Sequence, residues 1–241
     1  MEGKEARFGI GASVMAAITT SNGATGSYSS MHDSFTPVGG MVTIVNMLLG
    51  EVVFGGLGSG LYGLVLTALV GVFVAGLMIG RTPEYLGKKL TVAEMKLVGL
   101  YAIVAPLTIL PLTALAVVTE AGVAGLTTNK GPHGLSEILV AYTTSLANNG
   151  QSFAGLDAST AFYNITTALA MVAGRFGLSI TALALAGRVA EQPRKALTDG
   201  SLPTDTVLFG GLVIATVVVV SALSYIPILA LGPVVEHFML R

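Results

Sequence analysis

Four stretches of this chain are apolar, almost free of charge and long enough to cross a membrane. Three contain no charged residue and the fourth contains only Arg175; they cover residues 52–80, 97–119, 206–235 and 158–187. About 20 apolar residues in a helix cross the roughly 30 Å hydrocarbon core of a bilayer. Only helices and closed barrels span membranes. Because 53% of the residues are hydrophobic and 10% are charged, the sequence predicts an all-α polytopic membrane protein.

The composition excludes several classes of protein. A net charge of −1 provides no basic surface for nucleic acid, so we expect no nucleic-acid partner. The chain has no cysteine, which rules out disulfides and thiolate metal sites. It has no phosphate-binding loop or nucleophile motif, and we expect neither an enzyme nor a cofactor. A charged lead-in without a signal peptide is typical of a membrane protein that begins partway through a longer one.

A polar motif occurs twice, about half the chain apart. Residues 18–27 and 142–151 both contain Thr-Thr-Ser followed by asparagine and glycine. Each follows an apolar helical pattern, 8–19 or 135–147, which rises only about 20 Å and cannot span. The carbonyl end of such a half-helix is its negative pole and suits a cation. We therefore predict two loops of an ion-selectivity filter that use backbone carbonyls as ligands. They comprise Thr20, Ser21, Asn22, Gly23 and Ala24, and Asn148, Asn149, Gly150 and Gln151.

The alternative is that both motifs are ordinary turns outside the bilayer. Their repetition with the same neighbours favours the filter. Glycine lets the backbone turn its carbonyls inward, and Gly23 and Gly150 are the candidates for this role.

Lysine and arginine residues predict the topology. The segments 81–96 and 188–205 hold seven of the twelve, and short positive loops prefer the cytoplasm. Both can be cytoplasmic only if 97–118 and 161–187 cross the membrane and 135–156 is re-entrant. The predicted parts are 1–80 (pore helix, filter loop and broken span), 81–96 (cytoplasmic loop), 97–187 (a second membrane–pore–membrane unit), 188–205 (cytoplasmic loop) and 206–241 (a final span to about Leu231 and an external C-terminus).

A carboxylate and a cluster of glycines interrupt the apolar segment 38–79. We interpret this segment as a helix broken near the middle of the membrane, where a glutamate is costly and marks a functional site. The alternatives are that the glycines serve only helix packing and that the glutamate lies at a water-filled mouth. The candidate gating or coupling residues are Glu51, Gly56, Gly58 and Gly60.

Three further charged residues have open roles. Arg175 lies inside a predicted span and should face protein, carbonyls or the ion path. It is either a fixed positive charge that repels the ion or a structural clamp on the loop carbonyls. We expect Asp33 and Asp157 to line the outer vestibule or simply to be solvated.

Several longer motifs are more specific than the filter loops. They lie at Gly23 with 31–35, and at 50–56, 80–89, 131–134, 148–150 and 230–236. Together they closely resemble the potassium-binding subunits of bacterial Kdp potassium-transporting ATPases, over nearly the whole chain.

The resemblance implies four K⁺-channel-like membrane–pore–membrane repeats around one filter, of which this chain carries the third and fourth. By resemblance, Gly23 and Gly150 are filter glycines, the 50–60 segment is a gating loop, and Arg175 is the arginine below the fourth filter. The implied function is to bind extracellular K⁺ and pass it to a P-type ATPase catalytic subunit, which hydrolyses ATP. The implied surroundings are small accessory membrane subunits, the N-terminal half of the same subunit and the lipid of a bacterial inner membrane.

The chain departs from the family in two respects. Asn22 stands where relatives often have cysteine, which should matter little if backbone carbonyls coordinate the ion. The first half of the subunit is absent, and two loops alone cannot surround an ion. Either the other half is a separate chain or this chain is a truncated, non-transporting remnant. A further alternative is a channel-like or ion-coupled K⁺ transporter of the same superfamily.

Overall fold

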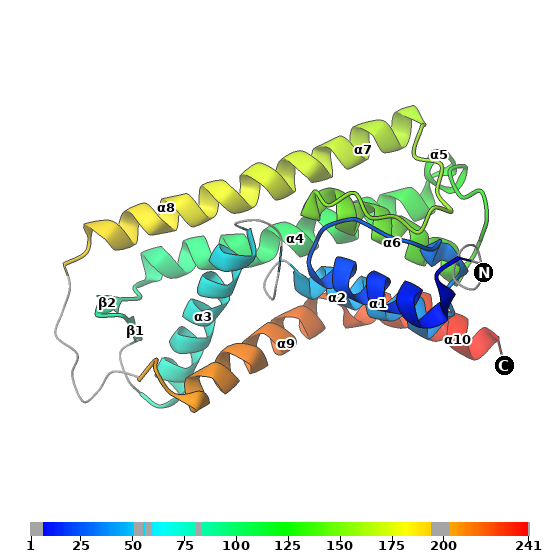
Figure 1. Ribbon diagram of the computed structural model, residues 1–241. Helices are drawn as coiled ribbons and strands as arrows, with labels where there is room; N and C mark the ends of the chain where they lie inside the picture. The colour runs from blue at the N-terminus through cyan, green and yellow to red at the C-terminus, as the bar shows by residue number, and fades with distance from the viewer. Residues whose placement is uncertain (1–6, 51–54, 56–58, 81–82, 194–202, 241) are drawn as a thin grey trace.

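The protein is an elongated bundle of helices. The computed structural model describes residues 7–50, 55, 59–80, 83–193 and 203–240, and Figure 1 shows its elements. The helices are α1 (Gly9–Asn22), α2 (Pro37–Gly50), α3 (Ser59–Met78), α4 (Val92–Val118), α5 (Glu120–Val123), α6 (Pro132–Ala147), α7 (Ala161–Val172), α8 (Leu178–Glu191), α9 (Val207–Leu229) and α10 (Val235–Met239). A 3-10 turn, η1, covers His32–Ser34, and π-helical turns η2 and η3 cover Ala173–Gly177 and Ala230–Val234.

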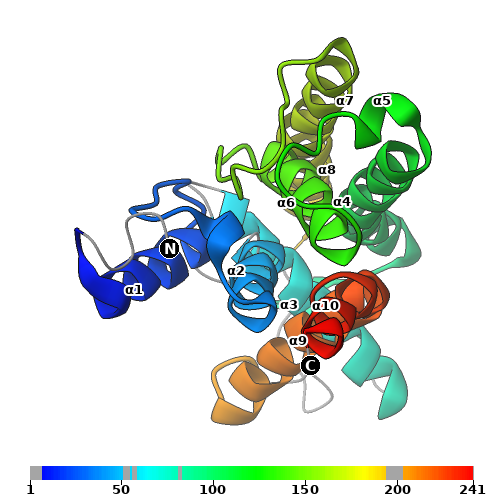
Figure 2. The ribbon, with the colours of Figure 1, turned by 90° about the vertical axis from the view of Figure 1, so that its right-hand side faces the viewer.

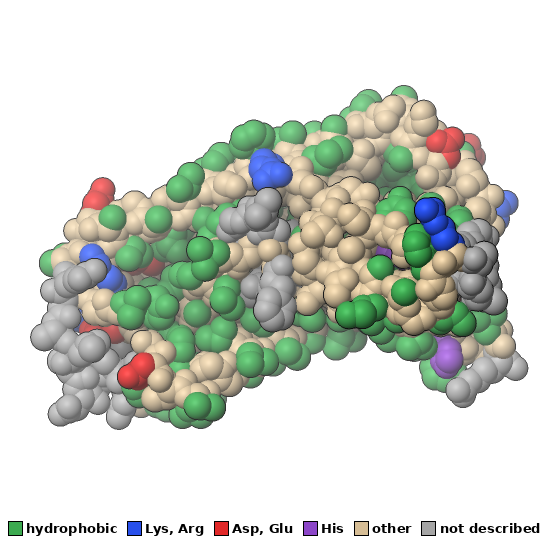
Figure 3. Space-filling view, viewed as in Figure 1, with side chains coloured by type: hydrophobic (Ala, Val, Ile, Leu, Met, Phe, Trp, Pro, Cys, Tyr) green, Lys and Arg blue, Asp and Glu red, His purple; other side chains and the backbone are tan. Residues whose placement is uncertain are grey.

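Four helical stretches in the described residues are long and apolar enough to cross a membrane. They are Gly60–Met78, Val92–Val118, Ala161–Glu191 and Val207–Met239. Their outward side chains are apolar as well, as Leu183 (71% exposed) and Leu223 (79%) illustrate, and Figure 3 shows hydrophobic side chains spread over one face of the molecule. Such a surface suits lipid rather than water. The prediction of an all-α polytopic membrane protein is confirmed.

Helices α1 and α6 are much shorter than these spans. They contain 14 and 16 residues, which rise about 21–24 Å. The chain that follows α6 returns beside the chain that precedes it, because the Thr127 amide donates to the Gly155 carbonyl at 3.1 Å and the Asp157 amide to the Gly125 carbonyl at 2.7 Å. The α6 segment therefore begins and ends in the same place, as expected of a re-entrant segment.

The two positively charged segments meet at one end of the molecule. A short hairpin of β1 (Glu84–Tyr85) and β2 (Lys88–Lys89) occupies the first of them. The Lys88 ammonium donates to the Gln192 carbonyl, and Arg188 Nε lies 3.4 Å from Glu94 Oε1. The chain termini lie at the opposite end of the molecule (Figure 1). This arrangement agrees with two cationic loops on one side of a membrane.

Helix α4 begins as its sequence predicts. Thr91 is the N-cap, and it forms a reciprocal capping box with Glu94. The helix then continues through Pro106 and Pro111 to Val118.

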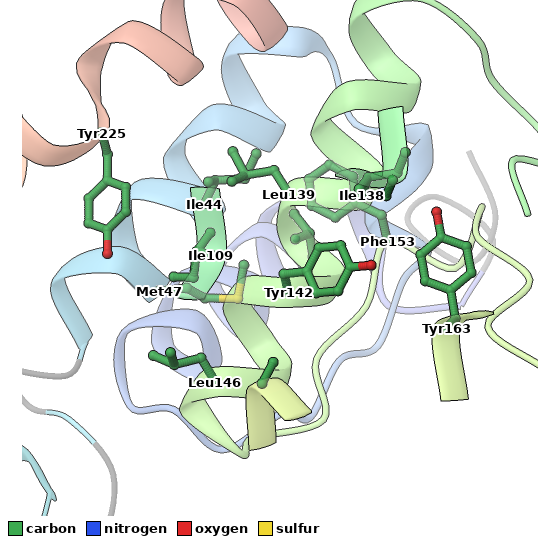
Figure 4. Packing of buried hydrophobic residues seen from close by; sticks show 13 residues of the cluster. Ile44, Met47, Ile109, Ile138, Leu139, Tyr142, Leu146, Phe153, Tyr163 and Tyr225 are labelled. Atoms are coloured by element: carbon green, nitrogen blue, oxygen red, sulfur yellow. The ribbon is translucent and has the colours of Figure 1, made fainter. Parts of the chain in front are cut away.

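Helix α6 lies at the centre of a hydrophobic core. Its residues Ile138, Leu139 and Tyr142 are at most 1% exposed. Figure 4 shows them packed among side chains of neighbouring helices. These neighbours are Ile44 and Met47 of α2, Ile109 of α4, Tyr163 of α7 and Tyr225 of α9. A short helix with a buried, partly polar surface thus sits inside longer apolar ones, whereas α1 packs against α2 and stands apart in Figure 2.

One expectation about an individual segment was wrong. The final helix does not end near Leu231, because the η3 turn carries it on to Met239. Between α4 and α6 the chain forms the short helix α5, and the segment 81–96 contains the β1–β2 hairpin. The predicted five-part division itself remains a prediction.

Gly174 allows α7–α8 to pack against the end of α6. A Cβ added to Gly174 would lie 1.9 Å from the Leu146 carbonyl oxygen, whereas one added to Gly187, in the same continuous helix, would meet nothing within 4 Å. Replacing Gly174 by alanine should therefore lower the free energy of unfolding by about 1–3 kcal/mol through overpacking.

The matched variant Gly187→Ala should be neutral or slightly stabilising, because alanine favours a helix over glycine by up to about 1 kcal/mol. Denaturing-detergent titration of both variants in mixed micelles would measure the difference. Equal stability of the two would contradict this contact.

Candidate ion-binding site

The two short helices end with the same pattern of hydrogen bonds. Each Thr-Thr-Ser triplet, 19–21 in α1 and 143–145 in α6, donates its three hydroxyls back to carbonyls three or four residues earlier. The bonds from Thr20 Oγ1 to the Ala16 carbonyl and from Ser145 Oγ to the Ala141 carbonyl are both 2.7 Å long. These hydroxyl protons are therefore engaged within their own helices.

The backbone of the first loop differs from our expectation. Helix α1 continues through Thr20, Ser21 and Asn22, so these residues form its last turn. Gly23 has a φ of −86°, a conformation open to any residue, so its backbone does not by itself require glycine, and its place in the filter stays a prediction. The left-handed conformations occur at Ala24 (φ 50°) and Gly26 (φ 72°) instead.

The second loop turns at the predicted place. Asn148 caps α6 in the left-handed conformation, and Gly150 has a φ of 73°. The side-chain amide Nδ2 of Asn148 donates to the Leu146 carbonyl at 2.9 Å and to the Met171 carbonyl at 3.2 Å. The loop is thereby fastened both to its own helix and to α7. Glycine is suited to the position of Gly150, since other side chains rarely adopt this φ.

The structure brings the two predicted loops into contact. A Cβ added to Gly26 would lie 1.8 Å from the Asn149 carbonyl oxygen and 3.4 Å from the Gln151 amide nitrogen. The Asp33 amide also donates to the Phe153 carbonyl at 3.0 Å, which joins the segments that leave the two loops. Two segments more than 100 residues apart in sequence therefore form one site.

The carbonyls of the two loops accept no hydrogen bond from the part of the chain that the structure describes. Among these residues, no hydrogen bond ends on a backbone carbonyl of 21–24 or 148–151; the last carbonyls that accept one are those of Thr20 and Leu146. Both loops also contain buried polar groups: Ser21 is 0% exposed and accepts from the Asn46 side chain at 3.2 Å, and Gln151 is 2% exposed. Unpaired carbonyl oxygens are the ligands that replace water around K⁺. The site therefore has the chemistry of a cation site.

The predicted gating residues fall mostly outside the described part of the chain. The undescribed residues include Glu51, Gly56 and Gly58, and the role of these three stays a prediction. Gly60 is described and buried at the start of α3. A Cβ on Gly60 would lie 2.8 Å from the Gly55 amide nitrogen. The absence of a side chain at Gly60 therefore lets the chain at Gly55 cross the helix closely.

Arg175 lies in the π-helical turn η2, next to Gly174, which contacts the last turn of α6. Its side chain is exposed, and within the described residues it forms no hydrogen bond or ion pair. A clamp on loop carbonyls would require such a bond, so the described chain provides no support for that role. Single π-helical turns are frequent at functional sites.

Sequence reasoning missed a buried cluster beside these loops. Asp33 is 7% exposed rather than lining a vestibule, while Asp157 is exposed and caps the Ser159 amide. Asp33 binds His133 of α6, and His133 also binds Glu236 of α10. Glu137, one turn further along α6, completes the carboxylate–histidine cluster. Apart from the spacing of His133 and Glu137 on one helix, no sequence signal links these distant residues.

The contact between the loops gives a prediction. Alanine at Gly26 would place its Cβ inside the Asn149 carbonyl and would adopt a positive φ, so Gly26→Ala should force the loops apart. Amide hydrogen exchange at 148–152 should then accelerate at least about tenfold, which corresponds to about 1.4 kcal/mol of lost protection. The control is Gly11→Ala in α1, where an added Cβ meets nothing within 4 Å. Unchanged exchange in Gly26→Ala would mean that the loops do not support one another.

Known proteins resemble the chain along its entire length. Residues 1–238 match the family described as Potassium-transporting ATPase A subunit. The chain is 55% identical over 241 residues to the potassium-transporting ATPase potassium-binding subunit of Paracidovorax citrulli, and 54% identical over 240 residues to those of Dechloromonas aromatica and Laribacter hongkongensis. These alignments cover all of this chain and 40–42% of each relative. The chain belongs to the potassium-transporting ATPase A-subunit family.

Proposed function

We propose that the chain forms half of a K⁺-selectivity filter in an ATP-driven potassium-uptake complex. The observation that carries this proposal is the meeting of two equivalent helix ends, each followed by a loop whose carbonyls accept no hydrogen bond from the described residues. Extracellular K⁺ exchanges its water for carbonyls of 20–24 and 148–151. The negative ends of α1 and α6 favour the cation at this position.

The rest of the filter comes from another part of the same subunit. The chain spans about two fifths of the length of its curated relatives, and loops from two directions do not surround an ion. An N-terminal part with two further membrane–pore–membrane repeats closes the ring. Helix α1, which packs on α2 and otherwise exposes Ile10, Met15 and Ile18, offers an apolar face for it.

The subunit binds and delivers K⁺ and does not itself hydrolyse ATP. K⁺ passes from the filter through a route gated by the 50–60 segment, with Arg175 as the fixed positive charge below the fourth loop. A P-type ATPase catalytic subunit hydrolyses ATP, and small accessory membrane subunits complete the complex in the bacterial inner membrane. The relatives are named as potassium-binding subunits of a potassium-transporting ATPase, which supports this assignment.

Growth on limiting K⁺ tests the proposal. The host lacks its own K⁺-uptake systems and produces this chain together with an N-terminal part and the ATPase subunits. Gly150→Asp should raise the K⁺ concentration for half-maximal growth at least about tenfold, a loss of about 1.4 kcal/mol, because a carboxylate side chain enters the ion path.

The matched control is Gly80→Asp. Gly80 has a φ of 69° against 73° for Gly150, and both positions have open space for a Cβ, so the backbone strain is similar while the loops stay unchanged. Normal growth of Gly150→Asp on micromolar K⁺ would refute the filter assignment. Uptake that does not require the ATPase subunit would favour a channel-like or ion-coupled transporter, and no uptake with any partner would favour a non-transporting remnant.

A further inference from the structure

The carboxylate–histidine cluster joins three separate parts of the chain. Asp33 belongs to η1, in the segment that leaves the first loop; His133 and Glu137 belong to α6; and Glu236 belongs to α10. The side chain of Glu137 is 0% exposed, those of Asp33 and His133 are 5% and 13% exposed, and that of Glu236 is 17% exposed. The cluster therefore holds three carboxyl groups and one imidazole largely out of water.

The geometry of His133 requires an extra proton. Its Nδ1 lies 2.8 Å from Glu236 Oε1 and its Nε2 lies 2.8 Å from Asp33 Oδ1. A neutral imidazole has one N–H donor and one acceptor nitrogen, whereas an ionised carboxylate only accepts. Two bonds to two carboxyl groups therefore need a proton on both ring nitrogens, or a proton on one carboxyl. Either way, this arrangement binds one proton more than neutral histidine between two carboxylates.

Glu137 requires a second proton. Thr128 Oγ1 and Asn129 Nδ2 each lie 2.9 Å from Asp33 Oδ2 and 3.2 Å from Glu137 Oε1, so two carboxyl groups share one pair of donors. Glu137 Oε2 is buried and has no hydrogen-bond partner in the described part of the chain. An ionised carboxylate here would keep a buried negative charge, with no donor at Oε2, and would repel Asp33. Protonation removes the buried charge and the repulsion.

The described residues around the cluster supply no compensating positive charge. The titratable groups that face Glu137 are Asp33, His133 and the phenol of Tyr163 on α7, whose hydroxyl donates to the Gly122 carbonyl at 2.8 Å. Within the described residues, no lysine or arginine pairs with the cluster. Three ionised carboxylates with one imidazolium would leave an excess of two negative charges, so protons have to supply the balance.

The acid–base behaviour of the groups agrees with this geometry. Burial, together with the neighbouring Asp33 carboxylate, raises the pKa of Glu137 to about 7. Burial by itself would lower the pKa of His133, but the carboxylates of Glu236 and Asp33 outweigh it, and the pKa of His133 is raised.

A metal ion fits the same residues less well. The ring nitrogen Nε2 directs its bond at Asp33 Oδ1, which lies only 2.8 Å away. Zinc bonded to a histidine lies about 2.0–2.1 Å from the nitrogen along that direction. It would therefore collide with the oxygen unless Asp33 moved.

We propose that the carboxylate–histidine cluster is a proton-binding site. It holds two protons and thereby fastens η1 and α10 to the N-terminal end of α6. Loss of the protons leaves like charges buried side by side and releases these contacts. The proposal does not depend on K⁺ binding, because it rests on hydrogen bonds outside the two loops.

Spectroscopy of the whole chain in lipid nanodiscs tests the proton count. At pH 6, ¹⁵N resonances should show protons on both ring nitrogens of His133, assigned by their loss in His133→Gln, with His237→Gln as the control. Infrared difference spectra between pH 6 and pH 9 should contain a carboxylic-acid C=O band that disappears in Glu137→Gln and persists in Glu120→Gln, where the carboxylate is exposed.

Stability against pH gives an independent readout. Because the pKa of Glu137 is raised above its ordinary value of 4.5 to about 7, its contribution is complete below pH 4.5 and is lost as the pH rises through 7. The thermal midpoint of the wild-type chain should fall between pH 5 and 8. It should fall less in Glu137→Gln, which is neutral at every pH.

Several outcomes would overturn the proposal. One is a single protonated ring nitrogen on His133 together with no acid band that depends on Glu137. Another is a pH dependence of the thermal midpoint that is equal in wild type and Glu137→Gln. A third is stoichiometric metal that co-purifies with the chain, or Zn²⁺ alone shifting the His133 resonances at micromolar concentration, which would make the cluster a metal site instead.

Discussion

The structure depends on how backbone N–H and C=O groups find partners inside a membrane, where no water reaches them. A helix leaves its last carbonyls without intrahelical partners, and in a membrane such groups are tolerated only inside protein or beside a cavity. Helices α1 and α6 are both too short to span. Their last turns send every Thr and Ser hydroxyl backward to carbonyls of the same helix. Within the described residues, the carbonyls of the following loops receive no hydrogen bond, and we propose a cation as their partner.

Two π-helical turns let long helices approach α6 closely. In η2, Gly174 contacts the Leu146 carbonyl near the C-terminal end of α6; in η3, a Cβ on Gly232 would lie 2.8 Å from Ser136 Oγ near the other end. Each long helix therefore presents a glycine to α6 at the place where its own hydrogen bonding is irregular. In both long helices, the glycine that faces α6 therefore lies within the π turn.

Local sequence signals predicted much of the fold. The four spans follow from apolar runs, and the start of α4 follows from Thr91 and Glu94, since both patterns act over a few residues. The pairing of the two loops could be predicted because their sequences repeat.

Contacts between distant residues could not be predicted in this way. Nothing near Asp33 indicates His133, which lies 100 positions away. The positive φ occurs at Gly26 and not at Gly23, and Gly26 lies against the Asn149 carbonyl of the other loop. These features arise from packing between segments, where one position in the sequence gives no information about its partner.

The most direct test is to locate the ion. The chain would be assembled with an N-terminal part and the ATPase subunits, crystallised in Tl⁺ or Rb⁺ in place of K⁺, and examined by anomalous scattering. We expect a peak within coordination distance of carbonyl oxygens from both 20–24 and 148–151. A peak that contacts neither loop, or carbonyls of both loops turned away from the ion, would contradict it.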